Sequence, residues 1–443
     1  MRPYCCSSLQ SDTFFYVRCI ITPGLLRLST RIDVMSSSHG HSTARARSAR
    51  TLRHAVLACL IFMSTLEIAF ATSGTDPRLG LPPTNTDSNA PAVVSLGRRL
   101  FFDKRLSLDG TISCASCHIP DKAFSDGLVV ARGIRGQLGT RNTPSLWNVA
   151  FASSVFWDGR RATLEEQAAD PLLNSREHGL PNSGLLRAKV GRDASYQSDF
   201  RRAFGVAPEE IGLAQIVTAL AAYERTLVAG GSAFDRYLYG GDPLALSAGA
   251  VRGLNLFRGR AQCATCHVIG EHYALLTDNL YHNVGIGLTQ IRSHLAQLTS
   301  RIADQTPDAM DRLIGADAEV AALGRFVVTK QPRDIGSFRT PSLRNVALTA
   351  PYMHDGSAAT LDDALDVELY YRGIELHAPL ILTPAEKFDV LEFLHSLTSP
   401  AAVPTARQSG RRTASKIRST AEPGLPLREF ATQNGSRGHL ARP

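Results

Sequence analysis

The chain has 443 residues, 44% of them apolar, which is enough for two globular domains. Its net charge of +8 lies at the two ends, because residues 1–71 and 401–443 together hold 16 of the 48 basic residues and only 5 of the 40 acidic ones. Residues 72–400 therefore carry a net charge of −3, which excludes nucleic-acid binding through a basic surface.

The N-terminal segment has the order of a secretory signal peptide. An Arg-rich stretch at 45–53 precedes an apolar run at 55–66, and residues 69–71 (AFA) match a small-x-small cleavage site. The apolar run is short for a membrane-spanning helix, and Glu67 interrupts it. We therefore expect a leader with a signal peptide over 1–71 and no membrane span in the mature form, with an uncleaved anchor as the alternative. Residues 72–91, rich in Thr, Pro, Asn and Asp, are predicted to be a mobile lead-in.

A CxxCH motif occurs twice, 149 positions apart, with the residues Cys114, Cys117 and His118 in the first copy and Cys263, Cys266 and His267 in the second. In this signature the cysteines form thioethers to a porphyrin and the histidine becomes the proximal iron ligand. A zinc site would need a second ligand pair nearby, and a redox dithiol does not require the following histidine. The motifs therefore predict two covalently bound haem c groups.

The remaining four of the eight cysteines lie in the leader, so none is left for a disulfide in the mature chain. Haem c is attached on the outer face of the bacterial inner membrane. The leader and the haem motifs together predict a periplasmic protein.

An internal repeat links the two halves of the chain. Residues 143–150 (TPSLWNVA) recur as 340–347 (TPSLRNVA), and residues 162–166 (ATLEE) recur as 359–363 (ATLDD). Residues 156–159 (FWDG) recur as 353–356 (MHDG), and all three pairs are offset by 197 positions. The second half thus holds about 48 more residues between its haem motif and its repeat block.

Helical patterns dominate the chain. Leu96, Leu100 and Phe101 are spaced for one buried helical face, residues 211–227 are apolar with helical spacing, and so are residues 384–397, with Thr383 as the N-cap. We predict a mainly α protein made of two tandem cytochrome-c-like haem domains. An N-terminal domain spans 92–240, a C-terminal domain spans 241–400, and a disordered basic tail spans 401–443.

With both motifs and the repeat in view, residues 90–400 resemble the bacterial di-haem cytochrome c peroxidase family, including its MauG branch. The resemblance rests on the two CxxCH motifs and on the stretches FWDGR, LEEQA and TAPYMHDG. It implies that His118 is the proximal ligand of a haem that binds hydrogen peroxide. His267 would be the proximal ligand of a second haem, which relays electrons.

The resemblance also implies roles for several polar residues. Gln167 and Glu177 match a pair that lies over the peroxide site, where a carboxylate moves a proton from the near oxygen to the leaving one. Without the resemblance, Glu177 would be an ordinary solvated carboxylate. Trp157 matches a tryptophan between the two haems, whereas Trp147 is expected to be a core residue. A calcium ion between the domains would be bound by Asn142, Thr349 and Pro351.

Two features depart from the conventional peroxidases. These carry a histidine that blocks the first haem, but no histidine occurs here between His118 and His178, so the first haem should be open without prior reduction. The second haem of the family has a Met or Tyr as sixth ligand, 19 positions after a residue that matches Thr349.

That count reaches Glu368, yet a Tyr-x-Arg-Gly pattern with two residues inserted favours Tyr370 as the possible sixth ligand. Tyr371, Glu368 and Met353 are the alternatives. His282 and His354 are expected to lie near the haem edge without binding iron.

Three functions remain open on these residues. One is a MauG-like peroxidase that uses hydrogen peroxide to oxidise the haem pair and then a protein substrate. Another is a detoxifying cytochrome c peroxidase that takes electrons from a small cytochrome c or a cupredoxin. The third is a di-haem electron carrier without peroxide chemistry, against which Gln167 and Glu177 argue.

Overall fold

The computed structural model describes residues 76–83 and 90–403, which belong to one compact unit beginning at Thr75. The predicted leader at 1–71 and residues 404–443 of the predicted tail lie outside the described residues. No helix within the described ranges combines the length and the apolar character that a membrane crossing requires.

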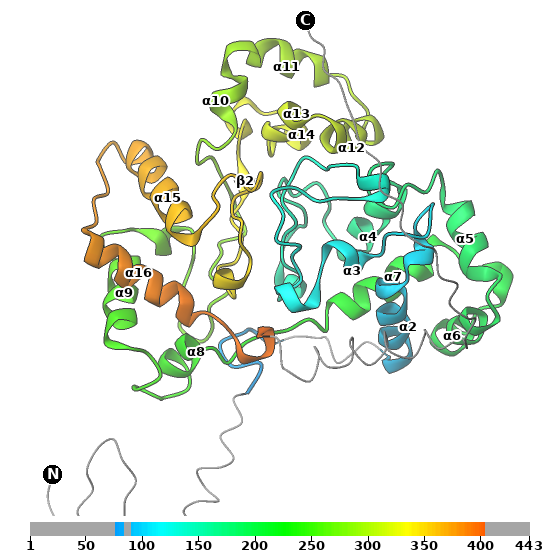
Figure 1. Cartoon of the computed structure of the whole chain (residues 1–443), viewed down its shortest axis with the longest axis horizontal. Coiled ribbons are helices and arrows are strands. Elements are labelled where there is room, and N and C mark those ends of the chain that lie inside the picture. Colours follow the sequence, from blue (N-terminus) through cyan, green and yellow to red (C-terminus); the bar gives the residue numbers. More distant parts are fainter. Residues whose placement is uncertain (1–75, 84–89, 404–443) are drawn as a thin grey trace, which may run out of the picture. The chain divides into compact units, whose positions relative to one another are not determined.

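The described chain is mainly helical, which confirms the predicted fold class (Figure 1). In its first half the helices are α2 (Pro91–Phe102), α3 (Cys114–Cys117), α4 (Leu164–Leu173), α5 (Ser183–Gly191), α6 (Ala194–Phe204), α7 (Leu213–Glu224) and α8 (Ala233–Leu238). In its second half they are α9 (Ala248–Arg258), α10 (Leu288–Ile291), α11 (Leu295–Ile302), α12 (Pro307–Ala316), α13 (Ala318–Ala322), α14 (Phe326–Thr329), α15 (Leu361–Glu375) and α16 (Pro384–Ser396). In the described part, the only strands are β1 (Tyr281–His282) and β2 (Phe338–Arg339), which pair antiparallel.

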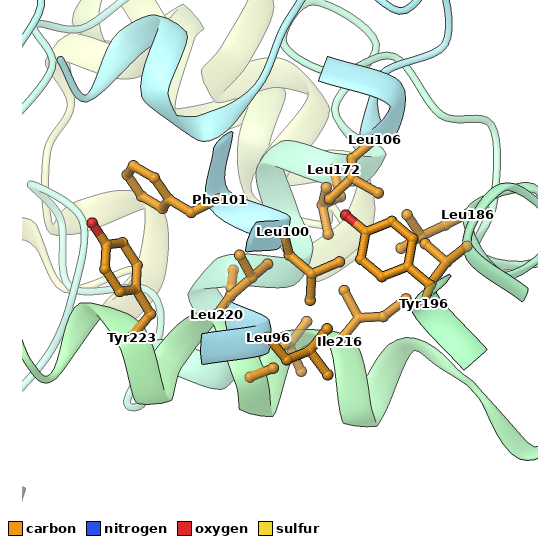
Figure 2. Packing of buried hydrophobic residues seen from close by; sticks show 14 of the residues in the cluster. Leu96, Leu100, Phe101, Leu106, Leu172, Leu186, Tyr196, Ile216, Leu220 and Tyr223 are labelled. Carbon is orange, nitrogen blue, oxygen red and sulfur yellow. The ribbon is translucent and has the colours of Figure 1, made fainter. Parts of the chain in front are cut away.

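The core of the first half forms where α2 crosses α7. The predicted face of Leu96, Leu100 and Phe101 is buried there, as Figure 2 shows. The two helices approach closely at Gly97, where a Cβ atom would lie 1.7 Å from the carbonyl oxygen of Ala219. Only glycine allows this approach, so Gly97 determines how α2 packs on α7.

The second half repeats this crossing with α9 on α16. Gly253 is its close-approach residue, since a Cβ atom there would lie 1.9 Å from the carbonyl oxygen of Asp389. Thr383 caps α16 by accepting a hydrogen bond from the backbone N–H of Glu386, as the sequence predicted. The same helix pair thus builds both cores, although the exact domain limits drawn from the repeat stay a prediction.

The additional residues of the second half form a small helical subdomain, α10 to α14, with its own core. Met310 and Ile314 of α12 pack there with Ile302 of α11. The subdomain also binds the first half, because Thr140 donates a hydrogen bond of 2.6 Å to the carbonyl oxygen of Ile314. The repeat could not predict this contact, since the subdomain has no counterpart in the first half.

Part of the predicted lead-in is anchored. The backbone N–H groups of Gly230 and Gly231 donate to the carbonyl oxygens of Pro77 and Leu79, at 2.7 and 3.0 Å. The buried side chain of Arg344 donates to the carbonyl oxygen of Gly80. Residues 76–83 therefore pack against both halves, whereas 84–89 lie outside the described residues.

Candidate functional site

The first CxxCH motif forms the short helix α3, with its histidine directly after it. His118 Nδ1 lies 2.9 Å from the carbonyl oxygen of Phe124. A carbonyl oxygen can only accept, so Nδ1 carries the proton and Nε2 keeps its lone pair for a metal. Burial lowers the pKa of His118, which keeps the ring neutral. Cys114 and Cys117 are free thiols, as thioether attachment requires.

The second motif repeats this arrangement on the turn Cys263–Thr265. His267 Nδ1 lies 2.9 Å from the carbonyl oxygen of Leu276, and burial again lowers the pKa of the imidazole. Cys263 and Cys266 are free as well. Both motifs therefore present a neutral histidine with an available Nε2 and two thiols, the donor set that covalent haem attachment needs.

A cavity of about 310 Å³ lies beside the second motif. Cys263, Cys266 and His267 line it, so the residues present fit a porphyrin held at this place. Its wall also includes Asn142 and Trp157 from the first half. The cavity thus connects the second haem motif with the repeat block of the first half.

Trp157 is held at this boundary by hydrogen bonds on both sides. Its indole N–H donates to the carbonyl oxygen of Asn142 at 2.9 Å, and its own carbonyl oxygen accepts from the backbone N–H of Arg339 at 2.8 Å. The ring therefore has a fixed position between segments of the two halves. Trp147 instead packs against the first core, edge-on to Phe124 at 5.2 Å.

Glu177 lies in the loop after α4, close to the first motif. Its Oε1 accepts a hydrogen bond of 2.7 Å from Asn174 Nδ2, and its backbone carbonyl accepts from Ile134 N–H at 3.0 Å. Burial raises the pKa of the Glu177 carboxyl, although the guanidinium of Arg160 opposes the shift. Glu177 is thus a half-buried carboxyl with a raised pKa and not the fully solvated one that its sequence context alone would suggest.

The loop is fixed on its other side by Gly133. A Cβ atom on this residue would lie 1.9 Å from the carbonyl oxygen of Arg176, so any other residue would displace Glu177. Gln167 lies on α4, partly buried, and its amide has no hydrogen-bond partner among the described residues.

A charged cluster lies beside this loop, and little in the sequence indicates it. Asp158 is fully buried and pairs with Arg141 at 2.6 Å and with Arg160 at 3.1 Å. Burial opposes ionisation of Asp158, but the two guanidinium groups outweigh it and hold the pKa of this carboxyl well below its usual range. The FWDGR motif contains both Asp158 and Arg160, but their other ion-pair partners come from elsewhere in the chain.

One partner comes from the helical subdomain. Asp311 of α12 forms an ion pair with Arg160 at 3.1 Å and another with Arg161. Arg161 in turn pairs with Asp170 of α4 at 3.0 Å. Burial raises the pKa of Asp170 to about 6, with Arg161 opposing the shift and Asp311 adding to it. The subdomain is therefore connected electrostatically to the segment that carries Gln167 and Glu177.

The candidate ligands of the second haem are distributed over different faces of α15. Tyr370 is 65% exposed and does not line the cavity. Tyr371 packs against Gly285 and does not line it either. Glu368 does line the cavity, and burial raises the pKa of its carboxyl to about 7. The structure thus does not bring the favoured residue, Tyr370, to the haem site.

Met353, His282 and His354 also line the cavity. His282 Nε2 is bound to Asp278 at 2.7 Å, and the His354 ring stacks on Phe338 with 3.6 Å between ring centres.

Among the described residues, one cluster of potential metal ligands was found, and it consists of Cys266, Asp278 and His282. Because Cys266 belongs to a haem motif, its sulfur would be part of a thioether and no longer a thiolate ligand. The residues predicted for calcium, Asn142, Thr349 and Pro351, line the same cavity. They offer oxygen donors, which suit this ion.

Comparisons with known proteins agree with this geometry. The sequence model of the di-haem cytochrome c peroxidase family matches residues 91–243. The cytochrome-c peroxidase IdrP1 of Denitromonas iodatirespirans is 36% identical over 341 residues, which cover 73% of this chain and 86% of the relative. The methylamine utilization protein MauG of Methylorubrum extorquens is 34% identical over 331 residues, covering 73% and 83%.

Solved structures are similar as well. A MauG-like protein associated with microbial copper homeostasis superposes with a TM-score of 0.60 at 32% identity, covering 74% of this chain and 96% of its own. The diheme peroxidase BthA from Burkholderia thailandensis gives a TM-score of 0.56 at 26% identity, covering 73% and 92%.

Proposed function

The chain belongs to the di-haem cytochrome c peroxidase family, which makes it a haem peroxidase acting on hydrogen peroxide, and we propose that it works in the MauG-like manner. In this proposal peroxide oxidises the haem pair, and the oxidising equivalents then pass to a partner protein. The protein would act in the periplasm, after cleavage of the leader.

The observation that carries the proposal is that the segment after the first motif contains no histidine. From residue 119 to Glu177 no histidine is available to block the iron that His118 would bind. Two polar side chains of this region are the half-buried carboxyl of Glu177 and the amide of Gln167, which has no hydrogen-bond partner among the described residues. These residues suit an iron that is open to peroxide in its resting state.

When bound, the two haems supply the irons that bind peroxide and exchange electrons. The role of the protein's own residues in this proposal is to move a proton. Asn174 holds Oε1 of Glu177, so Oε2 remains to take the proton from the near oxygen of peroxide and return it to the leaving oxygen. The amide of Gln167 would orient the peroxide by hydrogen bonding.

Transfer between the halves depends on Trp157. Its fixed ring lies beside the cavity of the second motif, and its neighbours Asn142 and Arg339 come from opposite halves of the chain. A rigid indole at this place would carry an electron between the two haems. A calcium ion bound by Asn142 and the carbonyl groups of Thr349 and Pro351 would stabilise the same boundary.

Exit to a partner protein needs an oxidisable side chain at the surface. The chain has only two tryptophans, both in the first half, so the exit from the second half would be a tyrosine. Tyr370 is exposed and its ring lies edge-on to that of Tyr371 at 5.1 Å. This pair would be the exit, with Tyr370 serving as a surface residue and not as an iron ligand.

The test uses the purified ferric protein with both haems attached. Hydrogen peroxide is added without prior reduction, and the haem absorption is followed by stopped flow. We expect an immediate reaction, followed by slow turnover with a reduced small cytochrome c or cupredoxin. Fast turnover with these donors would instead favour a detoxifying cytochrome c peroxidase, and a reaction that requires prior reduction would contradict the open first haem.

A further inference from the structure

The second haem site contains a carboxylate that nothing so far explains. α15 is one unbroken helix, capped at its start by Thr360, which accepts from the backbone N–H of Asp363 at 3.1 Å. The residues of α15 that line the cavity are Leu361, Ala364, Leu365, Glu368, Leu369 and Arg372. They recur at helical spacing and form one face. Tyr370 lies on the opposite face, because two positions along a helix correspond to about 200°.

The internal repeat shows where the two helices beside the haem motifs differ. α4 is the counterpart of α15, since Thr163 caps α4 through the backbone N–H of Glu166 as Thr360 caps α15. With the repeat offset of 197, Gln167 corresponds to Ala364, and Pro171 corresponds to Glu368. Position 171 therefore offers no ligand atom to the first haem, whereas the same position in the second half offers a carboxylate.

The carboxylate of Glu368 has no hydrogen-bond partner among the described residues. The neighbouring Arg372 is engaged elsewhere, since it donates to Glu375 at 2.6 Å and to Thr265 Oγ1 at 3.0 Å. A half-buried carboxylate that faces a cavity without a direct partner is free to bind a group held in that cavity. The cavity that it lines is the one that Cys263 and His267 also line.

The competing side chains are less suited. His282 Nε2 is already bound to Asp278, and the ring of His354 stacks flat on Phe338. Met353 corresponds through the repeat to Phe156, which lies under the guanidinium of Arg160 at 3.4 Å and cannot bind a metal. Met353 thus offers a sulfur atom to the second site that its counterpart in the first half lacks, so the experiment must also test Met353 as a ligand.

We propose that Glu368 would be the sixth ligand of the second haem iron, which it would bind through a carboxylate oxygen in addition to the ligand His267. The inference rests on the proposed function in requiring two haems, but it does not depend on peroxide turnover. A carboxylate is a hard anionic ligand, which favours the ferric over the ferrous iron. It is also a weaker-field ligand than the thioether of Met, so the second iron should remain largely high-spin.

The test compares Glu368→Met, Glu368→Gln and Met353→Leu with the wild-type holoprotein, after haem content per chain is shown to be two. EPR spectra of the ferric forms and a reductive titration of each haem are recorded. We expect Glu368→Met to convert the second iron to a low-spin form and to raise its reduction potential. Glu368→Gln should change the spectrum and raise the potential in the same direction, and Met353→Leu should leave both unchanged.

Tyr370→Phe is the matched control on the same helix, and its spectrum and potentials should equal those of the wild type. The proposal is overturned if neither Glu368 variant changes the second haem, or if Met353→Leu or Tyr370→Phe changes its ligation instead. Peroxide is added to the same wild-type sample. If it does not react, the proposed function fails while the spectra still decide the ligand.

Discussion

α4 and α15 are equivalent helices of the internal repeat, but they carry different side chains at equivalent positions. Both begin after a capping threonine and follow the same repeat block. α4 has Gln167 and then Pro171, a polar amide and a residue that cannot bind iron. Over the second site α15 presents Ala364 and then Glu368. In our proposal, these two positions would leave the first haem site open and close the second, on the same fold.

The turns before these helices differ in the same way. Asp158 Oδ1 accepts from the backbone N–H of Arg160 at 3.2 Å, and Asp355 Oδ1 accepts from that of Ser357 at 3.0 Å. Only Asp158 is fully buried and paired with two arginines. The repeated turn is therefore a local structure in both halves, and in the first half it also carries the charged cluster beside Glu177.

The largest effect on stability is expected from this pair of turns. Asp158→Asn should lower the free energy of unfolding by about 3–5 kcal/mol, because it leaves the buried guanidinium of Arg141 without its counter-charge. Asp355→Asn should change it by no more than about 0.5 kcal/mol, since the amide oxygen can still accept from Ser357. Denaturant unfolding of both variants measures the difference, and equal losses would contradict the comparison.

The largest effect on activity is expected at Glu177. Glu177→Gln should slow the reaction of the ferric protein with peroxide by roughly 10²–10⁴-fold, because the amide cannot take up the proton. Glu209→Gln, an exposed carboxylate of the same half, serves as the control and should react at the wild-type rate. Stopped-flow absorption measures both rates, and a wild-type rate in Glu177→Gln would exclude the proton-transfer role.

A transplanted carboxylate sharpens the comparison of the two helices. Pro171→Glu places in α4 the residue that α15 has at the equivalent position, so it should close the first haem and slow its reaction with peroxide. Leu173→Glu adds the same charge to an exposed position of α4 and should not do so. If Pro171→Glu reacts like the wild type, ligation does not depend on this helix position.

Trp157→Phe tests the connection between the two sites. The first haem should still react with peroxide, because Glu177 and Gln167 are untouched, whereas oxidation of the second haem should become slower. Rapid-scan absorption that resolves the two haems measures this. Simultaneous oxidation of both haems at the wild-type rate would show that electrons take another path.

The smallest effect is a shift in pH dependence. Glu177 must be ionised to take a proton, and burial raises its pKa, so the rate should rise with pH through a value above the ordinary glutamate pKa of about 4.3. Asp311→Asn frees Arg160, whose charge lowers the pKa of Glu177. It also lets Asp170 ionise more easily, and an ionised Asp170 raises the pKa of Glu177, which opposes the shift. The influence of Arg160 on Glu177 is the larger of the two, so the rise should move to lower pH.

Asp308→Asn, an exposed carboxylate on the same helix α12, is the control. Its pH profile should match that of the wild type. An unshifted profile in Asp311→Asn would mean that the subdomain has only a structural role.

The sequence predicted what depends on short motifs and on helical spacing. The haem motifs, the buried face of α2 and the cap of α16 at Thr383 are local features, and the structure has them where they were expected. Tyr370 was favoured by assuming two inserted residues, but α15 runs without interruption and places Tyr370 on its outer face. The count of 19 positions without an insertion reached Glu368, and this residue lines the cavity.

The charged cluster could not be predicted, because its members are far apart in the sequence. Arg161 and Asp311 are 150 positions apart and meet only because α12 folds onto the first half. The subdomain that supplies Asp311 has no counterpart in the repeat, so neither periodicity nor internal similarity indicated where it would pack. Long-range contacts of this kind depend on the assembled fold.

The most direct test of an open first haem is a single addition of hydrogen peroxide to the fully ferric holoprotein. Our account predicts an immediate change in haem absorption with about one equivalent of peroxide per chain and no reductant present. If the ferric protein does not respond, and responds only after one haem has been reduced, then an internal ligand blocks the first iron and the account is wrong.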